Sequence, residues 1–301
     1  MKFIYGIICH RVTTALQVLI DEISKSPNSI ILIHVDKKSD INQFKKELNN
    51  KSIFYISDRV DVRWGSFTQI EATLNLLNEA KKYDFKYFSL LSGDDICVKP
   101  ISQIEEFLSK SNQEYIDHDK FADPTPRLKN IYSFNFLFKK GSSKSFTEKV
   151  LSKLISVSFK IGLFKNKFYQ DLPKLYKGTN WFTLTYDSIS YIDNYLDKNK
   201  NYINAFKKSF CGDEVFFHTI IYNSPFKEKI NLNYDLSPQA LMALRYIDWK
   251  TGPDYPRTLD KSDFKRISSS NALFARKMSP DLTLKELNKF LDQNRNNLET
   301  I

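Results

Sequence analysis

The sequence predicts an α/β fold built around an open parallel sheet, and two observations support this. Short apolar runs of strand length occur at residues 29–35 (SIILIHV) and 87–91 (YFSLL), as expected for parallel strands that are covered on both faces. Between such runs, apolar residues recur at the three- and four-residue spacing of helices. Strands that alternate with helices in this way form a parallel sheet with helices on both faces. A chain of 301 residues fits one large domain of this class, or two lobes.

The first third of the chain supplies most of the predicted elements. Residues 2–9 are predicted as a buried strand, and residues 12–24 as a helix with leucine and isoleucine on one face. Further strands are predicted at residues 29–35, 53–56 and 87–91. This order begins with the β-α units of a nucleotide-binding sheet.

Two helix starts are predicted from capping boxes, in which a serine is followed three residues later by Gln or Glu. Ser66 with Gln69 predicts the start of one helix, and Ser102 with Glu105 the start of the next. The pattern loosens after about residue 125 and returns with a predicted strand at residues 182–185.

Composition excludes several classes of protein. Hydrophobic residues at 42% and charged residues at 27% argue against disorder. Cys9, Cys97 and Cys211 are an odd number of widely spaced cysteines, so reduced thiols are predicted rather than disulfides or a zinc site. The chain has no apolar run of about 18 residues, as a membrane-spanning helix needs, and residues 1–10 do not resemble a signal peptide. We therefore expect a cytoplasmic protein.

The net charge of +10 is concentrated in one segment. Residues 127–177 hold 12 basic and two acidic residues, so the rest of the chain is neutral overall. Lys149, Lys153 and Lys160 fall on one side of an amphipathic helix predicted there. We favour a helix docked on the core with its lysines in water. The alternative is an anionic membrane surface, where each nearby lysine contributes about 1 kcal/mol. Nucleic acid ranks below both, because no recognition motif accompanies the charge.

Polar residues follow three predicted strands. His10, Asp36 and Asp95 stand at carboxyl ends, where sheets of this class bind ligands. Asp94 and Asp95 together could chelate Mg²⁺ or Mn²⁺ on a nucleotide diphosphate. An acidic strand end more often caps a helix or orders a loop, so both interpretations stay open.

A second acidic pair and several cations in the C-terminal part could also carry chemistry. Glu214, next to Asp213, could take the proton of an attacking sugar hydroxyl as a general base. The alternative is a first-turn helix residue favoured by the helix dipole. Arg257, Arg276 and Lys277 could neutralise a diphosphate leaving group without a metal, or they could be surface cations.

Seven short motifs occur in the order found in a known family. They are HVDKKSD at 34–40, WGS at 64–66, LLSGDD at 90–95, GTNW at 178–181, DEVFF at 213–217, LRYIDW at 244–249 and FARK at 274–277. On these motifs the chain resembles the core-2/I-branching β-1,6-N-acetylglucosaminyltransferases of glycosyltransferase family 14, and the resemblance extends from about residue 3 to residue 280. Residues 127–177 match no motif of that family.

The resemblance implies a GT-A-type fold with a Rossmann-like N-terminal half. It also implies an inverting transfer from a UDP-sugar, usually UDP-N-acetylglucosamine, without a metal or other cofactor. Residues 1–301 would form a single catalytic domain. Within it, residues 1–125 would bind the UDP-sugar, and residues 126–301 would bind the acceptor and supply the catalytic base.

The resemblance also assigns roles to individual residues. Glu214 matches the family's catalytic base. Lys277 matches the lysine that binds the diphosphate, and Arg257 is the best match for its partner arginine, with Lys265 or Arg266 as substitutes. Asp36 matches the aspartate that helps to hold the nucleotide, and Trp249 matches the tryptophan that stacks on the acceptor. Beside these matches, we expect donor contacts by His10 and Asp95, which stand at strand ends, and acceptor contacts by Trp181 and Arg245. Aromatic faces such as these suit sugar rings.

Animal members of the family carry a membrane anchor and disulfides, and this sequence resembles the soluble bacterial members. We therefore expect a cytoplasmic enzyme that extends a bacterial surface polysaccharide. Its acceptor would be a glycan, which could be linked to a lipid. Residues 127–177 could contact an anionic membrane. Two alternatives remain: a metal-dependent transferase that uses Asp94 and Asp95, and an inactive basic adaptor at a membrane surface or on nucleic acid.

Overall fold

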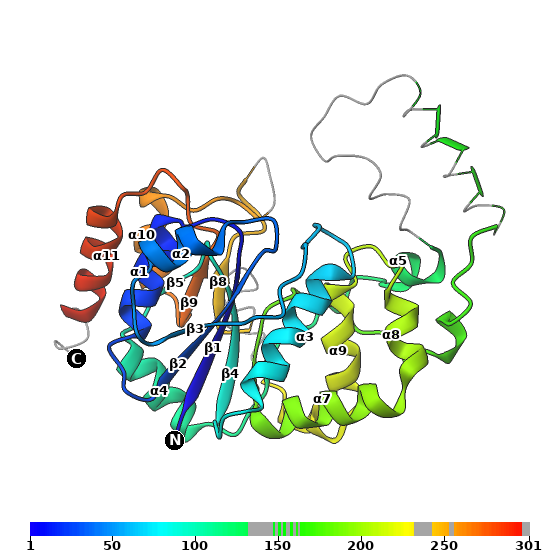
Figure 1. Cartoon of the computed structure of the whole chain (residues 1–301), viewed down its shortest axis with the longest axis horizontal. Coiled ribbons are helices and arrows are strands. Elements are labelled where there is room, and N and C mark those ends of the chain that lie inside the picture. The colour runs from blue at the N-terminus through cyan, green and yellow to red at the C-terminus, as the bar shows by residue number, and fades with distance from the viewer. Residues whose placement is uncertain are drawn as a thin grey trace.

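The computed structural model describes residues 1–131, 163–231, 243–252 and 256–296, together with eight separate positions between 147 and 161. Its centre is a six-stranded sheet in the order β3-β2-β1-β4-β7-β6. Figure 1 shows helices on both sides of this sheet, so the predicted α/β class is confirmed. No helix in the described part of the chain is long and apolar enough to cross a membrane.

Four strands from the first third of the chain form the parallel part of the sheet. They are β1 (Phe3–Cys9), β2 (Ser29–Val35), β3 (Ile53–Tyr55) and β4 (Tyr87–Ser92). β1 lies between β2 and β4, and β2 between β1 and β3. The apolar runs predicted these strands within one residue at each end. β1, β2 and β4 are buried over nearly their whole length, whereas only Ile53 is buried in the short β3.

One strand departs from the predicted parallel arrangement of the sheet. β7 (Phe182–Thr185) runs antiparallel both to β4 and to β6 (Tyr115–Ile116). β6 ends at the carboxyl edge of the parallel strands, and the chain between β6 and β7 begins and ends at that edge. β7 must therefore run away from it, which sequence periodicity does not reveal.

Two apolar layers flank the sheet. Alternate strand residues such as Ile4 and Leu90 pack against α3 (Thr68–Ala80), α7 (Tyr186–Lys198) and α9 (Asp213–Tyr222). The intervening residues pack in the opposite layer. The helices of that layer are α1 (Thr14–Ile23), α2 (Ile41–Glu47) and α4 (Ile101–Lys110). Three shorter helical turns, η2 (Tyr169–Asp171), α8 (Lys200–Phe206) and η3 (Pro225–Lys229), extend the first layer.

The C-terminal part returns to the N-terminal part through a second sheet. β5 (Ile96–Cys97), β9 (Phe274–Arg276) and β8 (Arg245–Ile247) pair in that order. η4 (Lys261–Asp263), α10 (Phe264–Ser268) and α11 (Leu284–Asn296) complete this region, where α11 packs against β5, β9 and α1. The predicted halves, residues 1–125 and 126–301, therefore share both sheets.

Both predicted capping boxes are wrong. α3 begins at Thr68, and Gln69 accepts a hydrogen bond from the Gly65 N–H instead of the N–H of Ser66. α4 begins after Pro100, and its Glu105 carboxylate accepts hydrogen bonds from serine hydroxyls at the end of α1 and the start of β2, at 2.6 and 2.7 Å. The side chain that each capping box needs is therefore bound elsewhere, by the neighbouring Gly65 in α3 and by distant serines in α4.

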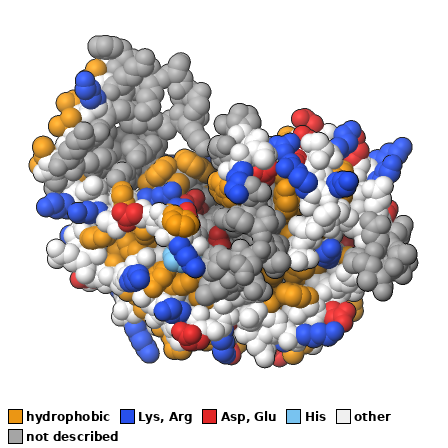
Figure 2. Space-filling view, turned by 180° about the vertical axis from the view of Figure 1, so that it is seen from behind, with side chains coloured by type: hydrophobic (Ala, Val, Ile, Leu, Met, Phe, Trp, Pro, Cys, Tyr) orange, Lys and Arg blue, Asp and Glu red, His pale blue; other side chains and the backbone are white. Residues whose placement is uncertain are grey.

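Part of the basic segment lies outside the described residues. This applies to Lys149 and Lys160, whereas Lys153 is described and exposed. The apolar side chains described nearby are 43–68% exposed, and they are Val150, Leu151, Leu154, Val157, Ile161 and Leu163. Hydrophobic and basic side chains stand together at the upper left of Figure 2. These six side chains are not docked on the core, in contrast to the interpretation favoured from the sequence.

Candidate functional site

The candidate site lies along the carboxyl edge of the parallel strands, where β1, β2 and β4 end. The Asp36 N–H donates a hydrogen bond to the Cys9 carbonyl at 2.8 Å, which joins the residues that follow β1 and β2. The Asp36 side chain is 5% exposed. Its Oδ1 accepts from the Lys38 N–H at 2.9 Å, and its Oδ2 pairs with the Lys38 ammonium at 3.2 Å.

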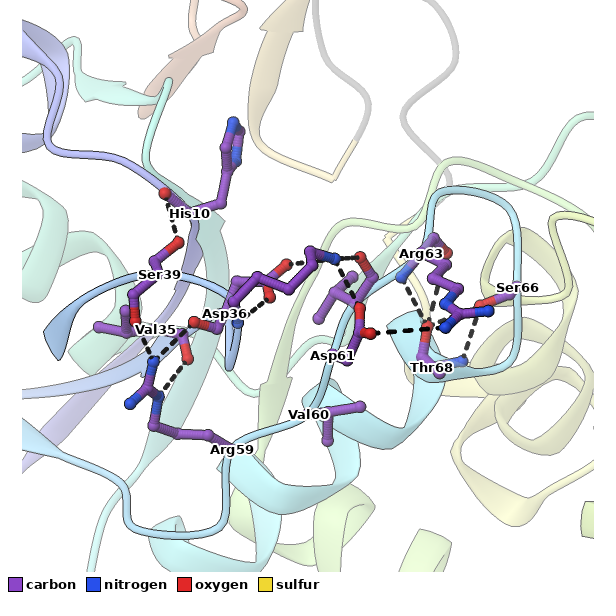
Figure 3. A network of polar contacts seen from close by, with 12 residues as sticks. His10, Val35, Asp36, Ser39, Arg59, Val60, Asp61, Arg63, Ser66 and Thr68 are labelled. Carbon is purple, nitrogen blue, oxygen red and sulfur yellow. Dashed lines mark hydrogen bonds and ion pairs between the residues drawn. The ribbon is translucent and has the colours of Figure 1, made fainter. Parts of the chain in front are cut away.

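Arg59, which no sequence pattern singled out, holds the loop that follows β2. Its guanidinium donates to the carbonyls of Val35, Asp36 and Ser39 at 2.9, 2.7 and 2.6 Å. The Ser39 hydroxyl in turn donates to the His10 carbonyl at 2.6 Å, as Figure 3 shows. The loops after β1 and β2 are thus held together, with Asp36 and the exposed His10 between them.

The surroundings of His10 favour the neutral form of its imidazole. Partial burial, followed by the positive charge of Arg11, lowers the pKa of His10 below its usual value. A neutral ring can both donate and accept a hydrogen bond.

Asp94 and Asp95 follow β4 and have different cation partners. Asp95 is fully buried, pairs with the Arg276 Nε at 3.1 Å and accepts from the Ser92 hydroxyl at 2.5 Å. Asp94 pairs with Arg11 at 3.3 Å and with Lys277 at 3.6 Å. The described residues contain no cluster of three potential metal-ligating side chains, and both carboxylates interact with cations of the chain itself.

Arg276 also connects β9 to the residue before β7. Its guanidinium carbon lies 3.9 Å from the ring centre of Trp181, which is 6% exposed. Arg276 therefore bridges Asp95 and Trp181 at the carboxyl edge, by an ion pair to the carboxylate and a cation–π contact to the indole. The guanidinium covers one face of the indole that was predicted to contact the acceptor.

Glu214 lies in the first turn of α9. Its Oε2 pairs with the Arg127 Nη1 at 2.6 Å and with the Lys177 Nζ at 3.1 Å, while its side chain remains 26% exposed. Arg127 belongs to α5 (Thr125–Lys129), and Lys177 lies in the loop that leads to β7. The sequence identified these two cations only as members of the basic segment, because their pairing depends on the fold.

The loop before β7 links Glu214 to the sheet. The Gly178 N–H donates to the Glu214 carbonyl at 3.0 Å. Thr179 donates to the Asp117 carboxylate with its N–H at 3.0 and 3.1 Å and with its hydroxyl at 3.1 Å. Asp117 follows β6 and also contacts the buried His218 of α9 at 3.3 Å. Residues 177–181 therefore connect Lys177, which pairs with Glu214, to Trp181, which contacts Arg276.

A second loop reaches the start of α9 from residues 64–66. The Cys211 N–H donates to the Gly65 carbonyl at 2.7 Å. Gly65 has a φ of +75°, and a Cβ there would lie 2.9 Å from the Phe210 ring, so only glycine fits this approach. Trp64, whose ring packs edge-on against Phe210 at 5.5 Å, stays 56% exposed. An exposed aromatic ring therefore lies on the loop that contacts this turn.

Arg245 departs from its predicted role. It is fully buried, and its guanidinium donates to the carbonyls of Ala243, Leu90 and Phe182 at 2.5, 2.6 and 3.2 Å. Burial lowers its pKa to about 10, so it stays charged at neutral pH. A side chain in this place joins the two sheets and offers no surface to an acceptor.

Arg257 and Trp249 lie near a cluster of carboxylates. Arg257 pairs with Asp263 at 2.7 Å, Asp260 at 3.6 Å and Asp248 at 3.8 Å. Arg266 binds the same Asp263. Trp249 follows Asp248 and is 37% exposed. No described contact joins this cluster to Glu214. Lys277, by contrast, lies beside Asp94 at the end of β4, and its side chain is 43% exposed.

A pocket of about 870 Å³ lies at the opposite, amino edge of the sheet. Its lining includes Phe3, Glu22 and Arg295. Glu22 binds Arg295, Lys25 at 2.6 Å and the Ile101 N–H at 3.0 Å. These contacts serve to join α1, α4 and α11. None of the residues predicted to act in catalysis lines this pocket.

Comparisons with known proteins identify the family. A model of the Core-2/I-Branching enzymes matches residues 3–273. The beta-glucuronosyltransferase GlcAT14B of Arabidopsis thaliana is 30% identical over 110 residues, which are 36% of this chain and 24% of that protein. The chain thus matches about a quarter of that relative's length.

Among solved structures, residues 1–349 of S. aureus TarS show 14% identity and a TM-score of 0.28, with 81% of this chain and 79% of that chain covered. This score is too low to carry an argument. The family model, in contrast, extends over nearly the whole sequence and includes both the strand ends that hold Asp36, Asp94 and Asp95 and the start of α9 that holds Glu214. The chain therefore belongs to the Core-2/I-Branching enzyme family.

Proposed function

We propose that the chain is an inverting glycosyltransferase that moves a sugar from a UDP-sugar to a hydroxyl of a glycan acceptor. The observation that carries this proposal is the Glu214 carboxylate, which is partly exposed and held by two cations at 2.6 and 3.1 Å. A fixed carboxylate at a solvent-accessible position suits a general base. Family membership supplies the reaction class, and the GT-A type of fold is part of the same proposal.

In the proposed reaction, Glu214 accepts the proton of the acceptor hydroxyl while that oxygen attacks the anomeric carbon of the donor. The new carbon–oxygen bond forms on the face opposite the departing UDP, so the configuration is inverted. Holding the two reactants in line lowers the barrier without covalent help from the protein. Asp36 and the neutral His10, at the ends of β2 and β1, would bind the nucleotide, beside Asp95 at the end of β4.

Lys277 would stabilise the negative charge that develops on UDP. Its ammonium lies 3.6 Å from Asp94, too long for a strong hydrogen bond, and its side chain is 43% exposed. It can therefore turn to a phosphate at modest cost. Arg257 is the second proposed cation, with Lys265 and Arg266 as substitutes. We propose no metal, because cations can neutralise the same charge.

The identities of the donor and the acceptor are more specific parts of the proposal. UDP-N-acetylglucosamine is the first donor to test, because the sequence motifs resemble those of N-acetylglucosaminyltransferases. UDP-glucuronic acid is the second, because the Arabidopsis relative is named as a beta-glucuronosyltransferase. Trp249 and the exposed Trp64 offer aromatic faces for acceptor sugars. The proposed role is the synthesis of a bacterial surface polysaccharide.

The proposed location is the cytoplasm, with peripheral contact to the inner face of the plasma membrane through residues 127–177. Two features support this contact. The segment holds 12 basic and two acidic residues, and six apolar side chains described between residues 150 and 163 are exposed. Basic side chains beside exposed apolar ones are typical of elements that bind anionic membrane surfaces.

Transfer or hydrolysis of UDP-sugars in the presence of EDTA tests the reaction and the absence of a metal together. We expect activity with one UDP-sugar to survive EDTA. Loss of activity that Mn²⁺ restores would instead assign Asp94 and Asp95 as metal ligands. The Lys277→Ala variant should weaken UDP binding and turnover at least tenfold, about 1.4 kcal/mol, whereas the exposed Lys285→Ala control should change neither. No UDP-sugar turnover under any condition would contradict the proposed function.

A further inference from the structure

We propose that Arg127 and Lys177 are positioning residues that hold Glu214 by its Oε2, so that Oε1 receives the acceptor proton. This inference rests on the proposed role of Glu214 as the base. It adds which oxygen reacts and which side chains set its direction. Neither cation would contact the reacting atoms.

The evidence is that both cations converge on one oxygen. Arg127 Nη1 lies 2.6 Å and Lys177 Nζ 3.1 Å from Oε2 of Glu214. Within the described residues, the hydrogen bond that Glu214 accepts from a side chain goes to Oε2 and none goes to Oε1. An ionised carboxylate has acceptor capacity on both oxygens, so the arrangement leaves one of them available to a substrate.

The cations are themselves fixed by the structure around them. Arg127 Nη1 also donates to the Cys211 carbonyl at 3.4 Å, and the Arg127 carbonyl accepts from the Phe210 N–H at 3.4 Å. The residue after Lys177 is Gly178, whose N–H binds the Glu214 carbonyl at 3.0 Å. Each cation is therefore held close to the chain segment that carries Glu214.

Burial distinguishes this cluster from an ordinary surface ion pair. The side chains of Arg127, Lys177 and Glu214 are 30%, 16% and 26% exposed. Exposed pairs on flexible side chains contribute little and hold no fixed geometry. Charge-assisted hydrogen bonds in a partly desolvated place are shorter and stronger, so they can hold a long side chain in one orientation.

Orientation is what a general base needs. The Glu214 side chain must place a lone pair within hydrogen-bond reach of the hydroxyl during the attack. A displacement of 1 Å can lower a rate by on the order of 10²-fold. Arg127 and Lys177 also stand at the two ends of the basic segment, so both ends of residues 127–177 meet at the proposed base.

Kinetics of Arg127→Gln and Lys177→Gln test the inference. Each variant should lose about tenfold or more in kcat, while KM for the donor and the affinity for UDP stay within about twofold. Arg127→Lys keeps a cation near Oε2 and should recover part of the lost kcat. The control is Lys81→Gln, which removes a cation of similar exposure, 29%, that pairs with Asp193 at 2.5 Å between α3 and α7. The control should keep the wild-type kcat.

A double-mutant cycle separates positioning from a general structural role. Adding Arg127→Gln to Glu214→Gln should have no further effect on kcat, because the cation acts only through that carboxylate. If the two losses multiply, or if both Gln variants keep the wild-type kcat, the positioning role is wrong. An active Glu214→Gln variant would instead remove the proposed function on which the inference rests.

Discussion

Two adjacent carboxylates at the start of α9 differ sharply in their surroundings. Glu214 is partly exposed and bound to two cations. Asp213 is 6% exposed, and its Oδ1 has no hydrogen-bond partner among the described residues. Burial, followed by the negative charge of Glu214, raises the pKa of Asp213 to about 7. Burial therefore distinguishes the two carboxylates, which the sequence pattern alone did not, and Glu214 is the one that a substrate can reach.

The raised pKa of Asp213 predicts a pH dependence of stability. The folded state holds a proton on Asp213 that the unfolded state releases above its ordinary pKa near 4, so stability falls as pH rises from about 4 to 7. Asp213→Asn removes this ionisation. Its free energy of unfolding relative to wild type should rise by a few kcal/mol, as an order of magnitude, between pH 4 and pH 7.

Urea unfolding at pH 4.5 and pH 7.5 measures this difference. Asp21→Asn, on the exposed side of α1, is the matched control and should follow wild type at both pH values. Parallel pH profiles for wild type and Asp213→Asn would show that Asp213 is ionised in the folded protein at all these pH values.

At the level of elements, the site is built by loops that leave β1, β2 and β4 and by the loop that enters β7. Gly178 is the tightest point of the last loop. A Cβ there would lie 2.5 Å from the His218 Nε2 and 2.6 Å from the Asp117 Oδ1. The close approach lets the Gly178 N–H bind the Glu214 carbonyl, which ties the start of α9 to the carboxyl edge of the sheet.

Gly178→Ala should therefore lower both stability and turnover. The added methyl group forces the loop away from His218 and Asp117, at a cost of about 1–3 kcal/mol. The matched variant is Gly6→Ala in β1, where the Cβ would lie 2.2 Å from the Phe88 ring, inside the core. Both variants should melt at lower temperature, but at a temperature where both are folded only Gly178→Ala should lose kcat. Equal kcat values for the two variants would show that this loop does not influence Glu214.

Local patterns predicted the elements whose environment is uniform along their length. β1, β2 and β4 are buried almost throughout, so an apolar run suffices to find them. Both helices begin within two residues of the predicted starts, but the capping boxes do not form because Gln69 and Glu105 bind other partners. The pair of Arg127 with Glu214 joins residues 87 positions apart, and no local pattern contains that information. For the same reason Arg245, predicted at the acceptor site, proved to be a buried connection between the sheets.

On the scale of the whole molecule, the charge is unevenly distributed. The net charge of +10 equals the excess within residues 127–177, and the remaining sequence is neutral overall. Both ends of this segment, at Arg127 and Lys177, contact the proposed base. A membrane that bound the segment would therefore hold the site close to its surface, where a lipid-linked acceptor would lie.

Binding to vesicles tests the proposed membrane contact. Affinity for vesicles with anionic lipid should fall as the Debye length shortens from ~10 Å at 0.1 M salt to ~3 Å at 1 M. Replacing Lys149, Lys153 and Lys160 by Gln should weaken binding by up to about 3 kcal/mol, at about 1 kcal/mol for each charge. Transfer to a short water-soluble acceptor should be unchanged. Vesicle binding that changes neither with salt nor with the substitutions would contradict the proposed membrane contact.

The most direct test of the account is the turnover of Glu214→Gln with the preferred UDP-sugar, measured beside its affinity for UDP. Gln keeps the shape of the side chain and cannot accept the proton, so kcat should fall by about 10² to 10⁴ while UDP affinity stays nearly intact. Glu228→Gln, at an exposed position in η3, should behave as wild type. Near wild-type turnover by Glu214→Gln would contradict the central claim, because the carboxylate held by Arg127 and Lys177 would then not be the base.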